Sequence, residues 1–193
     1  AAVFHAFGID FCCKGDRSIA DACERKNGEP RALIDALQKE IQQDENKSTD
    51  YNSWPIDLLA DYIEKKHHRY VDSRITEIKP FLNKVVSVHG GRHPELAEVA
   101  ELFDQTAGEL TAHMPFGTVE NPIAMMHHEH DVEGERFQKI ASLTNNYTPP
   151  VDACNTYRVT FAMLKEFEDD LHLHIHLENN ILFPKSMEME KQF

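Results

Sequence analysis

Apolar residues recur every three or four positions along most of the chain after position 54. This spacing is typical of amphipathic helices, and no run of alternating β-branched residues interrupts it. The sequence therefore predicts an all-α fold. Loops rich in polar residues, glycine or proline divide the periodic part at residues 90–91, 115–122 and 145–150. Four long helices with short connections result, which favours an up-down four-helix bundle. We expect Pro80 to end or kink the first of them.

The N-terminal part is predicted to form three small helices. Gly8 stops the first, and Ser18 caps the second with Asp21 three residues further on. Pro30 opens the third, at a position where a proline is well tolerated because its missing N–H would have no partner there. These residues are the expected punctuation of short helices.

A polar segment, DENKSTDYNS at 44–53, separates the two parts and shows no apolar periodicity. Such a segment is typical of a linker. We therefore predict a small helical N-terminal domain over residues 1–48 and the four-helix bundle over residues 49–193.

Histidine is unusually frequent, with 12 among 193 residues. Each predicted long helix carries a histidine on its apolar stripe, which must face the bundle interior. The second, third and fourth helices carry His113, His130 and His174 there. In the first helix both His67 and His68 fit the stripe, so periodicity does not choose between them.

One histidine on an apolar stripe is more often a hydrogen-bonded core residue than a metal ligand. Four that converge would leave buried polar groups unsatisfied, at a cost of roughly 1 to 3 kcal/mol each. Metal ligation satisfies all of them. Glu178 also follows His174 at i+4, which puts two kinds of ligand on one helix face. The sequence therefore predicts a metal site inside the bundle.

The predicted ligands repeat along the chain: His68 and His113 are 45 positions apart, and His130 and His174 are 44 positions apart. Two helical hairpins that each contribute two histidines suggest two half-sites and two metal ions.

The second hairpin places Glu178 four residues after its histidine, but Gly117 stands at the equivalent position of the first hairpin. Pro115 also breaks that helix one turn early, and Glu120 is a poor substitute because Pro115 and Gly117 intervene. We favour the interpretation that residues are missing from this chain after His113. The absence of an initial methionine points the same way.

Mixed imidazole and carboxylate ligands suit iron, manganese or zinc, and bridging carboxylates favour two irons. Glu109 lies one turn before His113 and Glu129 precedes His130, so both are candidates to orient ligands or relay protons. The alternative for both, a solvated or salt-bridged glutamate, has equal weight. Four further histidines are not expected to be direct ligands: His89, His93, His172 and His176.

Charge and composition exclude several partners. The chain has 33 acidic against 20 basic residues and a net charge of −13, so a nucleic-acid backbone would be repelled. No apolar run approaches the roughly 20 residues that cross a bilayer, so we expect no membrane partner. Two of the four cysteines are adjacent and the others are scattered, which is not the framework of a small secreted domain and favours a cytoplasmic protein.

Cys12 and Cys13 are adjacent, which is neither a zinc-binding nor a thioredoxin spacing. They are either a reactive thiol pair beside Lys14 and Arg17 or two small buried residues at a turn. From spacing alone, the inert alternative is favoured.

The motifs of both parts together resemble the iron-sulfur cluster repair proteins, the RIC or ScdA-type di-iron family, over nearly the whole chain. The motifs are DFCCKGDRSIADAC at 10–23, HGGRHPEL at 89–96, ELTAHM at 109–114, EHDVEG at 129–134, TNNYTPPVDAC at 144–154 and LENNILFP at 177–184.

This resemblance implies a hemerythrin-like bundle with a non-haem di-iron centre, bridged by carboxylate or oxo groups. The implied iron ligands are His68, His113, His130, His174 and Glu178. The resemblance thus decides for His68 over His67, and Gly117 departs from the family pattern. It also implies a function for Cys12 and Cys13 in redox or nitric-oxide chemistry or in delivering iron, and it suggests a homodimer.

The leading function implied by the resemblance is repair of iron-sulfur clusters damaged by nitrosative or oxidative stress, with iron donated to damaged iron-sulfur proteins. One alternative is reduction of nitric oxide at the di-iron centre, which Glu109 and Glu129 would support. Another is a hemerythrin-like module that binds or senses dioxygen or nitric oxide. The sequence alone leaves open whether the protein is an enzyme.

Overall fold

The computed structural model describes residues 2–9, 18–25, 28–43, 49–110 and 120–192. All regular structure in these ranges is helical, which confirms the predicted all-α, hemerythrin-like bundle with a small N-terminal helical region. Within the same ranges, no helix is both long enough and apolar enough to cross a membrane.

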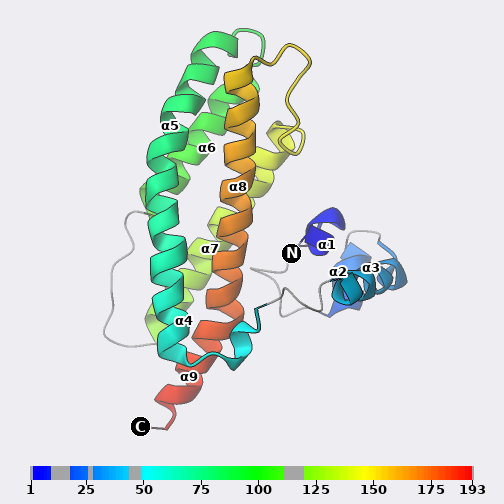
Figure 1. The fold of residues 1–193 in the computed structure, drawn as a ribbon, viewed down its shortest axis with the longest axis vertical. Coiled ribbons are helices and arrows are strands. Elements are labelled where there is room, and N and C mark those ends of the chain that lie inside the picture. Colours follow the sequence, from blue (N-terminus) through cyan, green and yellow to red (C-terminus); the bar gives the residue numbers. More distant parts are fainter. Residues whose placement is uncertain (1, 10–17, 26–27, 44–48, 111–119, 193) are drawn as a thin grey trace.

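Four long helical stretches run up and down the bundle (Figure 1). The first joins α4 (Ile56–Tyr62), the π-helical segment η2 (Ile63–His68) and α5 (Arg69–His89). The second is α6 (Glu95–Leu110) and the third is α7 (Glu120–Leu143). The fourth joins α8 (Asn155–Leu177), the π-helical segment η3 (Glu178–Leu182) and α9 (Phe183–Glu190). α5 packs against α6 and α8, and α7 closes the bundle against the same two helices.

α5 continues through Pro80 to His89, so Pro80 does not end this helix, which was one of the two outcomes predicted for it. A proline inside a helix removes one backbone hydrogen bond and crowds the preceding turn. Here Ile78 and Leu82 flank Pro80 and are both buried in the core, with 0% and 2% of their surface exposed. Their packing holds the helix together on both sides of the proline.

Three phenylalanines form the centre of the core. Phe103 of α6, Phe137 of α7 and Phe167 of α8 have no exposed surface. The Phe167 ring lies 5.3 Å from that of Phe103 and 5.6 Å from that of Phe137, measured between centroids. Removing one such ring costs about 3 to 5 kcal/mol, so these contacts fix the alignment of three of the four helical stretches.

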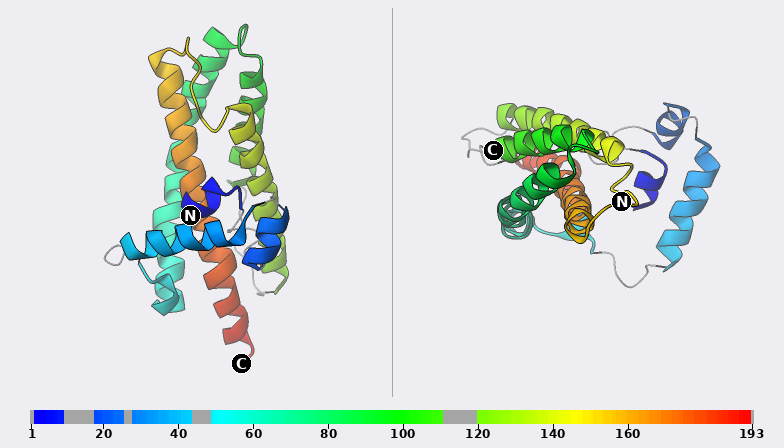
Figure 2. Two further views of the ribbon diagram at one scale, coloured as in Figure 1. Left: turned by 90° about the vertical axis from the view of Figure 1, so that its right-hand side faces the viewer. Right: turned by 90° about the horizontal axis from the view of Figure 1, so that it is seen from above.

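The predicted N-terminal helices are present as α1 (Ala2–Ala6), α2 (Ile19–Arg25) and α3 (Pro30–Gln43), which lie beside the bundle (Figure 2). Gly8 follows α1 with a φ of +64°, which glycine adopts without strain. Ser18 Oγ accepts the N–H of Asp21 at 3.1 Å and donates to its carboxylate at 2.5 Å. The residues predicted to end and begin these helices therefore do so.

A second, smaller apolar cluster lies where α4 and η2 meet η3, and it consists of Leu59, Ile63, Leu177 and Ile181. Trp54 packs on this cluster, and its ring lies 5.0 Å from Tyr51 in the short helix η1 (Tyr51–Ser53) and 5.2 Å from Tyr62. The main core includes Val71, eight residues beyond Ile63, and Ile175, two residues before Leu177. The polar side chains of the candidate metal centre lie between these two apolar clusters.

Candidate metal centre

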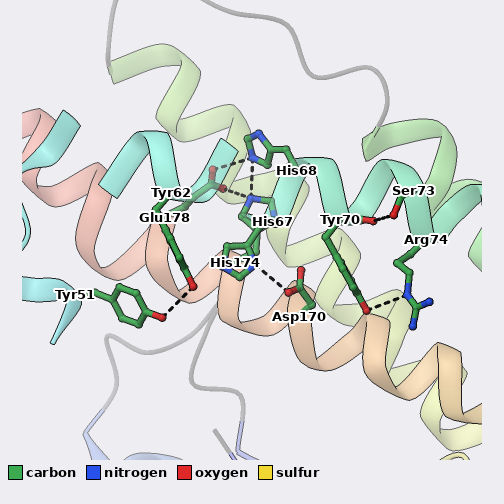
Figure 3. A network of polar contacts seen from close by, with 10 residues as sticks. All are labelled: Tyr51, Tyr62, His67, His68, Tyr70, Ser73, Arg74, Asp170, His174 and Glu178. Carbon is green, nitrogen blue, oxygen red and sulfur yellow. Dashed lines mark hydrogen bonds and ion pairs between the residues drawn. The ribbon is translucent and has the colours of Figure 1, made fainter. Parts of the chain in front are cut away.

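Both π-helical segments occur where polar side chains gather. In η2 the N–H of Arg69 bonds to the carbonyl of Glu64, and in η3 the N–H of Phe183 bonds to that of Glu178, five residues back in each case. Such a widened turn holds one extra residue, so side chains adjacent in sequence can both face the interior. The close-up in Figure 3 shows the result for His67 and His68, which both lie against His174.

Three imidazoles from three helical stretches converge on the carboxylate of Glu178. Oε2 lies 3.0 Å from Nε2 of His130 and 3.2 Å from Nε2 of His174. Oε1 lies 3.5 Å from Nε2 of His68. The two carboxylate oxygens thus face imidazoles on different helices.

Most of this cluster is withdrawn from solvent. The exposed fractions of the side chains are 3% for His130, 5% for His174 and 7% for Glu178, against 44% for His68. Burial alone would raise the pKa of Glu178, but the three surrounding imidazoles, His174 foremost, hold that pKa well below its usual range. The buried carboxylate is therefore ionised and faces nitrogen atoms.

The facing nitrogens of His68 and His174 show that this donor set fits a cation. Their Nε2 atoms lie 3.0 Å apart, and at most one of them can donate a proton to the other. Burial lowers the pKa of His174, which disfavours a second proton there. Ligand atoms of His68, His174 and Glu178 all lie within 4.8 Å of one another. A bound cation would use the nitrogen lone pairs and the carboxylate charge together.

Two family comparisons agree with this geometry. Residues 59–186 match the family described as "Hemerythrin HHE cation binding domain". Residues 1–41 match a "Domain of Unknown function (DUF542)". The chain therefore carries a cation-binding bundle behind a separate N-terminal family domain.

Relatives match both parts at once. "Iron-sulfur cluster repair protein YtfE" of Musicola paradisiaca is 31% identical over 207 positions that cover 98% of this chain and 91% of the relative. "Iron-sulfur cluster repair protein ScdA" of Staphylococcus haemolyticus is 30% identical, with 96% and 91% covered. A "Probable iron-sulfur cluster repair protein" of Haemophilus influenzae is 33% identical, with 95% and 89% covered. The chain belongs to this family of hemerythrin-like repair proteins.

The alignment with the first of these relatives is longer than this chain, 207 positions against 193 residues. The relative therefore carries residues that this chain lacks. The interpretation that residues are missing after His113 stays a prediction.

Asn179 fixes the orientation of His130, and sequence reasoning missed it. Its Oδ1 lies 2.8 Å from Nδ1 of His130, so that nitrogen donates and Nε2 is directed at Glu178. A hydrogen bond of this kind sets the ring orientation of a ligating histidine. The ring of Phe183 stacks on His130 with centroids 6.0 Å apart. Periodicity could not find Asn179, because only the π turn brings it inside beside Glu178.

His67 takes a different part from His68. Its Nδ1 lies 3.1 Å from Oδ1 of Asp170, and its ring stacks on His174 with centroids 5.8 Å apart and planes 8° from parallel (Figure 3). Its Nε2 has no partner among the described residues. The structure thus brings His68 to Glu178 and places His67 behind His174.

Of the remaining predicted site residues, the structure describes Glu109 and Glu129. His113, Gly117, Cys12 and Cys13 lie outside the described residues. Glu109 pairs with Arg136 through two hydrogen bonds of 2.8 and 2.5 Å. Glu129 is half-buried beside His130.

Arg136 also binds Glu133, a buried carboxylate that sequence reasoning missed. Glu133 lies one turn beyond His130 on α7 and is 1% exposed. Burial raises its pKa, while the hydroxyl of Thr106 and the guanidinium of Arg136 oppose the rise. The contact between Arg136 and Glu133 therefore lies one turn beyond His130 on α7.

Proposed function

We propose that this protein repairs damaged iron-sulfur clusters by donating iron held at Glu178. The observation that carries the proposal is the convergence of His68, His130 and His174 on one buried carboxylate. The three relatives described above, each aligned over at least 95% of this chain, are named as iron-sulfur cluster repair proteins, which supports the same function.

Glu178 is suited to bridge two metal ions, because each of its oxygens faces an imidazole from a different helix. Oε1 faces His68 and Oε2 faces His130. We propose a non-haem di-iron centre whose ligands are His68, His113, His130, His174 and Glu178. When bound, two irons supply reversible redox chemistry and an affinity for small diatomic molecules such as nitric oxide and dioxygen.

The exposure of His68 supports donation rather than permanent retention of iron. This side chain is 44% exposed, while the other described ligands are nearly enclosed. A partner or chelator that approaches from solvent therefore meets His68 first. His130, oriented by Asn179, and His174, packed against His67, remain in place on the enclosed side.

Nitric-oxide reduction is less well supported, because Glu109 faces Arg136 and not the cluster around Glu178. The guanidinium of Arg136 lowers the pKa of Glu109, which makes this carboxyl a poor proton donor near neutral pH. A cytoplasmic location, a homodimeric state, a response to nitrosative stress and a redox or iron-delivery role for Cys12 and Cys13 belong to the same proposal.

Iron transfer to an apo iron-sulfur enzyme tests this function. The iron-loaded protein is mixed with the apo enzyme, a sulfide source and a ferrous chelator that captures free iron, and the recovered enzyme activity is followed. Recovery with the wild type but not with the Glu178→Gln protein is expected. Sustained nitrous oxide production with a reductant, without iron transfer, would make the protein a nitric-oxide reductase and overturn the proposal.

A further inference from the structure

Another buried imidazole lies at the end of the bundle opposite the candidate metal centre, where α5 ends and α8 begins. His89 is the last residue of α5 and is 4% exposed. Its Nε2 lies 3.2 Å from Sγ of Cys154, an exposed free cysteine. Twenty helical positions separate Cys154 from His174, which at 1.5 Å per residue is about 30 Å. This pair therefore does not belong to the metal centre.

Both helix ends favour separation of charge between these two side chains. Cys154 is the N-cap residue of α8, and its side chain makes no capping hydrogen bond. The positive end of the dipole of this 23-residue helix favours a thiolate there. His89 stands at the negative end of the 21-residue helix α5, which favours an imidazolium. The antiparallel packing of α5 and α8 brings the two ends together.

His89 has no other described partner with which to share a proton. Its Nδ1 is buried and makes no hydrogen bond to any described residue. The ring of Tyr157, itself 1% exposed, packs against His89 with centroids 5.1 Å apart. The imidazole is thus held in place by packing, and the thiol of Cys154 is its polar neighbour.

The carboxylate of Asp152 and the imidazole of His93, at the same end of the bundle, have other partners. Asp152 Oδ1 lies 3.1 Å from Nε2 of His93, and Oδ2 lies 3.2 Å from Nη1 of Arg92. Nδ1 of His93 lies 3.2 Å from a carboxylate oxygen of Glu95. The carboxylate nearest in sequence to Cys154 is therefore neutralised by two cationic or protonatable partners, so it does not oppose a thiolate.

We propose that Cys154 and His89 form a nucleophile and base pair that exchanges with disulfides of low molecular weight. Nε2 of His89 accepts the thiol proton, and the thiolate sulfur attacks one sulfur of the disulfide. A new S–S bond to Cys154 forms while the old one breaks. The departing thiolate takes up the proton from His89, so no further oxidant or reductant is needed. The product is the protein with a mixed disulfide at Cys154.

The test measures how fast Cys154 forms a mixed disulfide with glutathione disulfide at pH 7, by mass spectrometry of the peptide that contains it. This readout separates Cys154 from the chain's other three cysteines. An ordinary thiol is only about 3% ionised at pH 7. We therefore expect Cys154 to react about tenfold faster in the folded protein than in the same chain unfolded in urea. The variants His89→Asn and His89→Gln should lose this advantage.

His176→Asn is the matched control, because it removes an imidazole that bonds to Asn180, 22 positions from Cys154 along the same helical stretch. It should leave the rate unchanged. Circular dichroism checks that each variant is folded. If no variant folds, the comparison of folded with unfolded wild type tests the proposal on its own. Equal rates in the wild type and both His89 variants, or no gain on folding, would show a structural contact only and overturn the proposal.

Discussion

The two ends of the bundle use buried imidazoles in different ways. Around Glu178, three imidazoles from separate helical stretches face one carboxylate, and two of them face each other with Nε2 atoms 3.0 Å apart. At the other end, one imidazole faces one thiol at 3.2 Å. One shared proton satisfies the imidazole and thiol of the single pair. In the cluster around Glu178, protons alone do not satisfy the facing nitrogens and the carboxylate as well as a cation does. The number of converging donors therefore separates a metal site from a proton-sharing pair.

Backbone geometry explains why donors gather at one end only. The π turns of η2 and η3 bring neighbouring residues such as Glu178 and Asn179 inside together. At the other end α5 stops regularly at Gly90, where a Cβ atom would lie 2.5 Å from the carbonyl oxygen of Val86. Only glycine, which has no Cβ, fits that close approach. α5 therefore ends before Gly90, and its last residue is the buried His89.

The largest expected effect comes from removing the carboxylate on which the imidazoles converge. Glu178→Gln keeps the shape of the side chain but removes the charge on which three imidazoles converge, so bound metal should fall to background. Metal content per chain measures this. Glu188→Gln, an exposed glutamate on α9, is the matched control and should retain all its metal. Equal metal in both variants would place the site elsewhere.

A smaller effect is expected from Asn179→Ala, which removes the acceptor that orients His130. Changes of this kind typically weaken metal affinity about 10- to 100-fold. Competition with a calibrated chelator measures the shift. Asn180→Ala serves as the control, because Asn180 is exposed and bonds to His176, outside the cluster. An unchanged affinity in Asn179→Ala would mean that packing against Phe183 alone orients the ring.

A third buried group, Glu168 of α8, is expected to affect the stability of the fold and not the metal centre. It is 2% exposed, and burial raises its pKa to about 7. A carboxyl with a raised folded-state pKa stabilises the fold below its unfolded pKa, near 4.5, and that contribution is lost as the pH rises to about 7. The Glu168→Gln protein should therefore have a larger free energy of unfolding than the wild type at pH 8, by about 3 kcal/mol. This difference should shrink toward pH 4.5. Urea denaturation at both pH values measures this difference, and metal content should stay unchanged.

The last substitution, at Cys154, is expected to have no effect on bound metal. Cys154→Ser should leave the amount and affinity of bound metal as in the wild type, because about 30 Å of helix separate it from His174. Chelator competition would show any change. A loss of metal in this variant would break the distinction between the two ends and link the thiol to the metal centre.

Local features of the sequence were enough to predict the helical architecture. Apolar periodicity, Gly8 and the Ser18 cap all predicted elements that are present. Pro80 does not end its helix, because buried neighbours on both sides outweigh the loss of one hydrogen bond.

The site was less predictable than the fold. A period of 3.6 residues placed His130, His174 and Glu178 on inward faces but could not choose between His67 and His68, because a π turn changes that period. The partners Asn179, Asp170 and Glu133 depend on contacts between helices, which no single-helix pattern reveals. The same limit hid the pairing of His89 with Cys154.

The central claim is that the cluster around Glu178 holds iron. Elemental analysis of the protein purified without added metal, together with its optical spectrum, tests it most directly. We expect about two irons per chain with charge-transfer bands of a bridged pair, and none in Glu178→Gln. One iron per chain would keep the site but reject the second metal. No metal, or zinc alone with no difference between the two proteins, would contradict the account.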